Sequence, residues 1–367
     1  MTRPRVAIAH DYLTQRGGAE RVVLAIARAF PGARIHTSVY EPDGTYPEFA
    51  DLDVVTTPLQ RVAPLRRDPR RALPVLAPVV GRHRIDADLV VASSSGWAHG
   101  FDTDGRVLVY CHAPARWLYQ PENYLGGPRW RSPKGLALAA LTPWLRRWDA
   151  AAAARADRYL ANSRVVRDRI REAYGIEAEV LAPPFGIDAD GALEPVAPLA
   201  DWADEGYLLI VSRLLPYKNV GAAIEAVRGT GHRLVVVGDG PLRAEIASSA
   251  PPNVRLARDL TDAQLRWVYA HATCLLAPSL EDFGLTPLEA AAAGVPTVAL
   301  RGGGYLDTVL EGTTGVFVDE VTPRAIAAGI DTAEQIPWDA PTIRAHAAGF
   351  GEERFAERLR QIAADLG

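Results

Sequence analysis

The sequence predicts an α/β fold in two domains, each built around a parallel sheet that helices cover on both faces. The chain has 367 residues, a length typical of two domains. Short β-branched runs alternate along it with longer segments of helical spacing. Residues 182–206 are rich in Pro, Gly and acidic side chains and lose the hydrophobic periodicity, as expected of a linker.

The elements follow the same order in both halves. In the first half, the strand-like run at 6–10 precedes a helix at about 17–30. In the second half, strand, turn and helix recur at 207–227, 234–249 and 273–294. We therefore expect Rossmann-like domains at 1–195 and 206–342, with a C-terminal helix at about 343–367 packing back on the first. Ligands of such sheets bind beyond the carboxyl ends of the strands, so a cleft between the halves is the expected site.

Composition narrows the function classes. Hydrophobic residues make up 48% of the chain and charged residues 23%, which is typical of a globular protein. The net charge of −4 disfavours binding to nucleic acid through overall charge. Cys111 and Cys274 lie far apart and outside any CxxC motif, so neither a disulfide framework nor a cysteine zinc site is expected.

The distribution of charge and apolar residues bears on location. Residues 1–200 carry a net charge of +4 and residues 201–367 one of −8, so the first half is the better match for an anionic surface. The apolar run at 6–9 is too short for a signal peptide, and no stretch of 18 apolar residues occurs. We expect a cytoplasmic protein, with peripheral contact at the inner membrane face left open.

The first candidate binding residues are Arg213 and Lys218. Of the 40 basic residues only Lys134 and Lys218 are lysines. Because arginine supplies nearly every other positive charge in this chain, a lysine at 218 suggests a specific function. Arg213 ends a predicted strand, and Lys218 follows just before a helix. A planar guanidinium and a flexible ammonium at one sheet edge suit a diphosphate. The alternative is a solvated loop with two cations.

A second candidate is the segment SLEDFGLTPLEAAAAG, in which Glu281 and Glu289 are separated by seven residues. The backbone amides of Phe283, Gly284, Leu285 and Thr286 fall at a predicted helix start, where an anion is stabilised. Glu289 could then accept from ribose hydroxyls and Glu281 from sugar hydroxyls. Alternatively, these acids are an ordinary helix residue and a loop charge.

A weaker signal is the Gly17–Gly18 pair before the first helix, which could admit an anion or simply form a strand-to-helix turn. It matches neither a dinucleotide fingerprint nor a P-loop.

Four segments together carry a resemblance: GGAERV at 17–22, RLLPYK at 213–218, GDGP at 238–241 and the pair Glu281 and Glu289. With them the chain resembles family 4 glycosyltransferases of the GT-B fold. Within that family it is most similar to the bacterial mannosyltransferases that build O-antigen and related polysaccharides.

The resemblance implies a role for each matching residue. Arg213 and Lys218 correspond to the diphosphate-binding pair, Glu289 to the ribose ligand, and Glu281 to an acid near the donor sugar. It implies a catalytic set formed by these two cations with Glu281 and His112, a histidine that projects toward the sugar. Without the resemblance, a lone His at a strand end is more often structural.

The resemblance also extends to weaker positions. Gly18, with Gly17 beside it, corresponds to a loop glycine near the phosphates. Arg258, Asp259 and Leu260 fall in the base-binding loop. The family usually has an acid in the turn after the donor helix, and GGGYLD offers Asp307 there, which leaves its role open.

The implied reaction is transfer of a hexose with retention of anomeric configuration. The first choice of donor is GDP-mannose, with UDP-sugars as the alternative, and the acceptor is a glycan, lipid-linked or small molecule. We expect no cofactor and no metal, because Arg213 and Lys218 can neutralise the diphosphate. None of the Asp-x-Asp pairs, 51/53, 86/88, 102/104 and 188/190, follows a strand into the predicted cleft. The rival functions are a GT-B epimerase and a non-catalytic sugar-binding protein.

Two further groups are candidates for contact with the acceptor. His10 and Asp11 end the first strand and are either acceptor contacts or structural residues. Residues 128–148 mix tryptophans with basic side chains and, with the four arginines at 66–71, are either a membrane-facing surface or a core helix with solvated ends.

Overall fold

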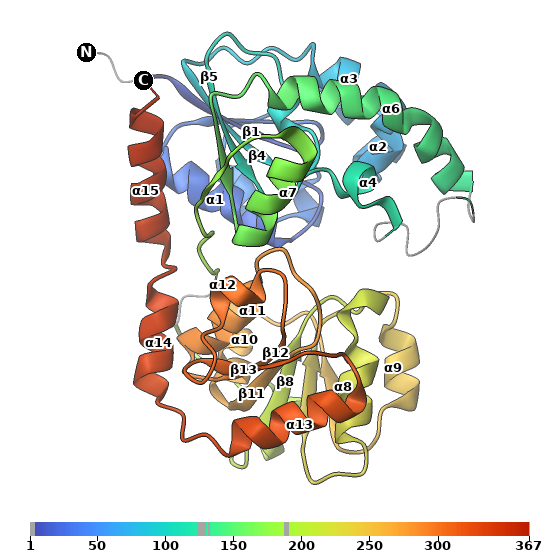
Figure 1. Ribbon diagram of the computed structural model, residues 1–367, viewed down its shortest axis with the longest axis vertical. Helices are drawn as coiled ribbons and strands as arrows, with labels where there is room; N and C mark the ends of the chain where they lie inside the picture. Colours follow the sequence, from blue (N-terminus) through green and yellow to red (C-terminus); the bar gives the residue numbers. More distant parts are fainter. Residues whose placement is uncertain (1–3, 123–129, 131–132, 187–190, 367) are drawn as a thin grey trace. The chain divides into compact units, whose positions relative to one another are not determined.

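The computed structural model describes residues 4–122, 130, 133–186 and 191–366. The chain folds into two compact units, which are Met1–Pro184 with Glu352–Gly367, and Phe185–Gly351. Each unit contains one parallel sheet with helices on both faces, which confirms the predicted α/β class (Figure 1).

The sheet of the first unit has the strand order β3-β2-β1-β4-β5-β6-β7. The order reverses direction between β1 and β4, because the chain first builds outward on one side of β1 and then on the other. The strands are β1 (Val6–His10), β2 (Arg34–Thr37), β3 (Val54–Thr56), β4 (Leu89–Ser94), β5 (Arg106–Cys111), β6 (Arg158–Ala161) and β7 (Glu179–Val180).

The helices of this unit divide between the two faces of its sheet. Ile8 of β1 packs toward α1 and α15, whereas Ala7 and Ala9 pack toward α3, α6 and α7, as the alternation of side chains along a strand requires. In Figure 1, α15 runs beside α1 although it ends the chain. The helices are α1 (Gly18–Ala29), α2 (Ala63–Arg67), α3 (Leu73–Val80), α4 (Arg116–Tyr119), α6 (Pro133–Ala153), α7 (Arg164–Tyr174) and α15 (Glu352–Ala364).

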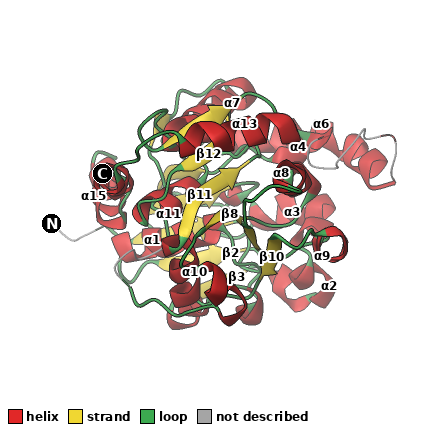
Figure 2. Cartoon of the chain, turned by 90° about the horizontal axis from the view of Figure 1, so that it is seen from below, coloured by secondary structure: helices red, strands yellow, loops and turns green. Residues whose placement is uncertain are grey.

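The sheet of the second unit has the order β10-β9-β8-β11-β12-β13, and it reverses direction between β8 and β11. Figure 2 shows β8, β11 and β12 side by side with helices around them. The strands are β8 (Tyr207–Val211), β9 (Leu234–Val237), β10 (Val254–Ala257), β11 (Ala272–Ala277), β12 (Thr297–Leu300) and β13 (Gly315–Val318). The helices are α8 (Val220–Val227), α9 (Arg243–Ser249), α10 (Asp262–Ala270), α11 (Leu285–Ala292), α12 (Tyr305–Thr308), α13 (Pro323–Glu334) and α14 (Ala340–Ala348).

The unit boundaries differ from the expected ones of 195, 206 and 342. Phe185 packs against Ile343 and Ala347 of α14, so the second unit begins before the acidic part of the predicted linker. Leu199 and Trp202, within the predicted linker, are buried in the core of the second unit. The expected C-terminal helix is divided into two helices, of which α14 packs on α11 and α15 packs on α1.

The strand order of each sheet determines where a ligand-binding site can form. In an open parallel sheet, the loops that leave the carboxyl ends of strands at a reversal point diverge and leave a crevice for ligands. In the first unit these loops follow β1 and β4, and in the second they follow β8 and β11. Most of the candidate residues lie at these two sheet edges.

Candidate functional site

Lys218 and Glu281 meet at the carboxyl edge of the second sheet. Lys218 ends a short 3-10 helix after β8, and Glu281 lies in the loop after β11. The Lys218 Nζ donates to Glu281 Oε1, and Ser279 Oγ donates to the same oxygen at 2.8 Å. The side chains of Lys218 and Glu281 are 14% and 22% exposed, so the ion pair is partly buried but accessible to solvent. Lys218 and Glu281, which belong to two separate sequence motifs, therefore form one ion pair.

Arg213 lies in the same loop as Lys218 and is exposed. Its guanidinium makes no hydrogen bond or ion pair with any other residue that the structure describes. An exposed guanidinium and a sheltered ammonium from one loop offer two cations to an anionic ligand.

The GDGP turn after β9 shapes this loop. A Cβ on Gly238 would lie 1.9 Å from the carbonyl oxygen of Ser212, and the φ of Gly238 is 151°. Leu214 N donates to the carbonyl oxygen of Asp239 at 2.9 Å. The turn therefore needs glycine because the backbones of two neighbouring strand-end loops touch.

The start of α11 lies at the same sheet edge. Gly284 is its N-cap with a φ of 93°, and a Cβ there would lie 2.5 Å from the ring of Tyr305. Phe283 is buried, whereas Leu285 and Thr286 are half-buried. The first N–H groups of a helix have no hydrogen-bond partners within the helix. The N-terminal turn of α11 therefore offers backbone donors that can bind an anion.

Glu289 projects from α11 and is held by a tyrosine that the sequence analysis did not identify. The Tyr269 hydroxyl, on α10, donates to Glu289 Oε2 at 2.7 Å. Burial and the charge of Glu289 raise the pKa of Tyr269 well above its ordinary value, so the phenol keeps its proton and acts as the donor. Because strand β11 lies between Tyr269 and Glu289 in the chain, no local sequence pattern predicts that the two side chains are in contact.

Tyr269→Phe removes this hydrogen bond and should weaken binding of a nucleotide ligand about ten- to a hundredfold, because a hydrogen bond to a charged group contributes about 1.5–3 kcal/mol. Titration calorimetry measures the change. Tyr207→Phe is the matched control, since Tyr207 is also buried and its hydroxyl donates to the carbonyl oxygen of Val268 at 3.0 Å. Equal affinities in both variants would show that Tyr269 does not orient Glu289 for a ligand.

The weaker candidates occupy more exposed positions. Arg258 follows β10, and its side chain is 52% exposed and paired with Asp239 and Asp259. Leu260 is half-buried and packs against the core. Asp307 lies half-buried on α12, in the turn where the family's acid was expected.

The candidates of the first unit lie at the carboxyl edge of its own sheet. Gly17 is the N-cap of α1 and Gly18 its exposed first residue, as predicted for the turn. His112 follows β5, is 9% exposed, and its Nε2 lies 2.8 Å from Ser93 Oγ of β4. Ser93 follows the apolar residues of β4 just as His10 follows those of β1. A polar residue at the carboxyl end of a buried strand is the signal by which Ser93 could have been identified.

His10 and Asp11 are both 1% exposed and make structural contacts in this unit, while contact with the acceptor stays a prediction. The Asp11 carboxylate accepts four hydrogen bonds at 2.7–2.9 Å from the turn after β4. These come from the backbone N–H groups of Ser95, Trp97 and Ala98 and from the Ser95 hydroxyl. Asp11 thus ties the ends of β1 and β4 together.

The described Asp-x-Asp pairs engage arginines at the surface. Asp86 and Asp88 both pair with Arg5, and Asp102 and Asp104 both pair with Arg84. Asp53 pairs with Arg34 in the same manner. The remaining pair, 188/190, lies outside the described residues.

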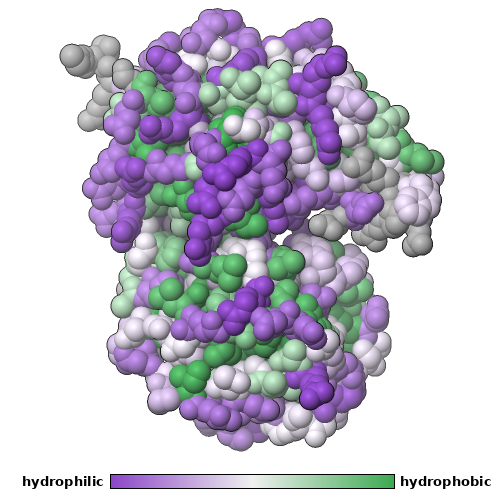
Figure 3. Space-filling model, in the orientation of Figure 1, coloured by the Kyte–Doolittle hydropathy of each residue, from purple (hydrophilic) through white to green (hydrophobic). Residues whose placement is uncertain are grey.

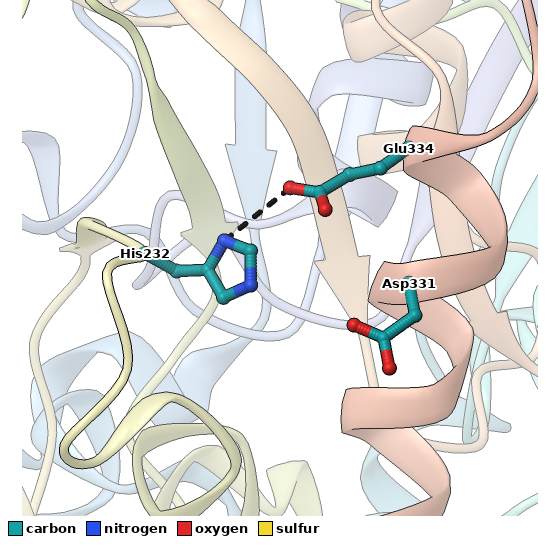
Figure 4. A group of neighbouring side chains, drawn as sticks. All are labelled: His232, Asp331 and Glu334. Carbon is teal, nitrogen blue, oxygen red and sulfur yellow. Dashed lines mark ion pairs between the residues drawn. The ribbon is translucent and has the colours of Figure 1, made fainter.

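Among the described residues, one group has ligand atoms close enough to suit a metal ion, namely His232, Asp331 and Glu334. Figure 4 shows the imidazole facing Glu334, with His232 Nδ1 at 3.3 Å from Glu334 Oε1. His232 and Glu334 line a cavity of about 360 Å³. His232 precedes β9, so the group lies at the amino edge of the sheet, opposite to Lys218 and Glu281.

The segment 128–148 falls partly outside the described residues, including Arg129 and Arg131. Trp130 and Trp144 are 69% and 45% exposed, whereas Trp148 packs against the core. Figure 3 shows hydrophobic surface at the far right of the upper unit, where the first turns of α6 lie. The packing of Trp148 fits the core-helix alternative, and contact with a membrane stays a prediction.

Two of the four arginines at 66–71 are held in ion pairs. Arg66 pairs with Glu41, Arg71 with Asp68, and Arg70 donates to the Tyr12 hydroxyl. Within the described part of the chain, none of the helices has the length and apolar character needed to cross a membrane.

Comparison with known proteins identifies relatives of both units. Residues 16–190 match the model of Glycosyltransferase Family 4, and residues 200–348 match that of Glycosyl transferases group 1. The chain is 30% identical over 299 residues to a D-inositol 3-phosphate glycosyltransferase of Actinosynnema mirum, which is 66% of this chain and 69% of the relative. It is 31% identical over 192 residues to a GDP-mannose-dependent alpha-(1-6)-phosphatidylinositol monomannoside mannosyltransferase of Mycolicibacterium smegmatis, 46% of this chain and 50% of the relative.

The chain thus spans about half to two thirds of the length of the curated relatives it matches. Among solved structures, HepE of Anabaena in complex with UDP-glucose aligns with a TM-score of 0.71 and 18% identity, over 99% of this chain and 100% of that one. This likeness shows the GT-B fold. By its matched models and its 30% identity to the Actinosynnema enzyme, the chain belongs to glycosyltransferase family 4.

Proposed function

We propose that this protein transfers a hexose from a nucleotide sugar to a glycan, lipid-linked or small-molecule acceptor, with retention of anomeric configuration. The observation that carries the proposal is the Lys218–Glu281 ion pair at the carboxyl edge of β8 and β11, with Arg213 in the same loop as Lys218 and Glu289 on the helix that follows Glu281. A nucleoside diphosphate needs cations for its phosphates and an acceptor for its ribose hydroxyls, and this edge offers both.

In the proposed reaction, the bond between the anomeric carbon and the diphosphate oxygen breaks as the acceptor oxygen bonds to the same carbon. The acceptor proton passes to an oxygen of the leaving diphosphate on the same face. Arg213 and Lys218 stabilise the charge that grows on the leaving group, which lowers the barrier. Glu281 and His112 orient the sugar, Gly17 and Gly18 approach the phosphates, and Arg258 and Leu260 flank the base.

GDP-mannose is the donor we propose first, supported by the likeness to bacterial mannosyltransferases and by the name of the Mycolicibacterium relative. UDP-linked sugars are the alternative, supported by the complex in which HepE was solved. The residues at this sheet edge favour a nucleoside diphosphate over other ligand classes, without selecting the base.

The test is a thermal-shift panel of GDP- and UDP-sugars, followed by turnover of labelled sugars with and without acceptors. The matching nucleotide sugar should raise the melting temperature, because a ligand that binds only the folded state stabilises it. Transfer only with acceptor supports the proposal, conversion of the sugar without acceptor indicates an epimerase, and binding without chemistry indicates a sugar-binding protein. We also expect full activity in excess EDTA, and loss that magnesium restores would contradict the metal-independent mechanism.

A further inference from the structure

A chain of buried polar groups links the ends of β1, β4 and β5 in the first unit. His10 Nδ1 lies 3.0 Å from the carbonyl oxygen of Ser93 and 3.2 Å from its Oγ. The same Oγ lies 2.8 Å from His112 Nε2. His10 and Ser93 are 1% and 0% exposed, so bulk water does not compete for these contacts. Ser93 therefore stands between two imidazoles.

Glu20 of α1 adds a buried charge behind His10. It is 1% exposed, and its Oε1 lies 4.0 Å from His10 Nε2 and accepts from Gln15 Nε2 at 3.0 Å. Its other oxygen, Oε2, is buried with no hydrogen-bond partner among the described residues. A carboxylate placed this way is costly unless a cation faces it, and His10 is the group in position to be that cation.

Burial by itself lowers the pKa of His10, but the Glu20 carboxylate, and to a smaller degree Asp11, raise it above its ordinary value. An imidazolium carries protons on both nitrogens, so Nδ1 must then donate to the carbonyl oxygen and Oγ of Ser93. The Ser93 hydroxyl has only one proton, and its remaining neighbour is His112 Nε2. The hydroxyl must donate there, which makes Nε2 an acceptor and leaves the proton of a neutral His112 on Nδ1.

We propose that Ser93, oriented by His10 and Glu20, is a positioning residue that fixes the tautomer and ring orientation of His112. The inference rests on the proposed function, in which His112 orients the donor sugar. It explains why two histidines, a serine and a glutamate are buried together at the sheet edge that carries Gly17 and Gly18.

The adjacent serine provides a matched control. Ser94 is also buried, at 2% exposed, and its Oγ lies 3.0 Å from the Nδ1 of a different buried histidine, His99. Ser93→Ala and Ser94→Ala therefore remove the same atom and the same kind of contact from neighbouring residues of β4. Only the first change touches the chain that leads to His112.

In steady-state kinetics, Ser93→Ala should lower kcat about ten- to a hundredfold with donor KM within about twofold, since loss of an orienting partner affects the oriented group rather than binding. Ser94→Ala should keep kcat within about twofold of the parent. Equal losses in the two variants, or a normal kcat in a folded Ser93→Ala protein, would overturn the proposal.

A second readout does not depend on activity. Imidazole ¹⁵N shifts, assigned with a His112→Gln sample, should show the Nδ1–H tautomer of His112 in the parent and in Ser94→Ala, and a mixture in Ser93→Ala. Glu20→Gln, which keeps the shape of the side chain, should give the same mixture of His112 tautomers. This variant tests the proposal if Ser93→Ala does not fold. An Nε2–H tautomer in the parent would refute the inference. Absence of turnover in the parent with every nucleotide sugar would refute the proposed function, while the spectra still decide the role of Ser93.

Discussion

Lys218→Met is expected to lower turnover of a nucleotide sugar by a factor on the order of 100 to 1,000, because the ammonium is proposed to neutralise the leaving diphosphate in a sheltered site. The variant also leaves Glu281 without its cation, although Ser279 still donates to it. Some loss of stability is therefore expected alongside the loss of turnover. Single-turnover kinetics and thermal unfolding on the same samples separate the two effects.

Arg233→Met is the control for removing a sheltered cation from the same unit. The Arg233 side chain is 28% exposed, pairs with Glu205, and lies at the amino edge of the sheet, away from Lys218. It should lose stability without losing turnover. The double variant Lys218→Met with Glu281→Gln removes the unpaired charge and should recover stability but not activity. A stable Lys218→Met protein with near-normal turnover would rule out the proposed role.

Asp11→Ala is expected to have the largest effect on stability, lowering the free energy of unfolding by about 3–5 kcal/mol. The side chain is 1% exposed and accepts four hydrogen bonds, so its removal leaves the backbone N–H groups of Ser95, Trp97 and Ala98 without their acceptor. Urea or thermal unfolding measures the change.

Asp53→Ala provides the comparison for Asp11→Ala. Asp53 is in the same unit, and its ion pair with Arg34 is exposed on both sides, at 59% and 58%. Exposed pairs contribute at most about 1 kcal/mol, so this variant should unfold close to the parent. Similar stability of the two variants, with turnover reduced only by Asp11→Ala, would show that Asp11 contacts a substrate instead.

Helix boundaries set by local signals could be predicted from the sequence. The helix predicted next to the Gly17–Gly18 pair begins at Gly18, and the predicted helix after the loop of Glu281 begins at Leu285. These boundaries depend on turn residues and on hydrophobic spacing within a dozen positions, which a single sequence displays. The family assignment rests on the same local kind of evidence, since its motifs are short loops between strand and helix.

Residues whose importance depends on distant partners could not be predicted from the sequence. Tyr269 reaches Glu289 from another helix, and Ser93 lies between two histidines that are 102 positions apart in numbering, His10 and His112. The C-terminal segment was expected to be one helix on the first domain. Its first part, α14, packs on α11 instead, and nothing in its own periodicity distinguishes the two partners.

The sequence by itself determined the alternation of strand and helix, the parallel sheets that follow from it, and the motifs that place the chain in its family. Only the tertiary structure decided that β8 lies beside β11 and β1 beside β4, because strand order is set by packing between segments far apart in the chain. That order pairs Lys218 with Glu281, and it buries His10 and Asp11 at a strand junction. Their chemistry was readable in the sequence, but their partners and their exposure were not.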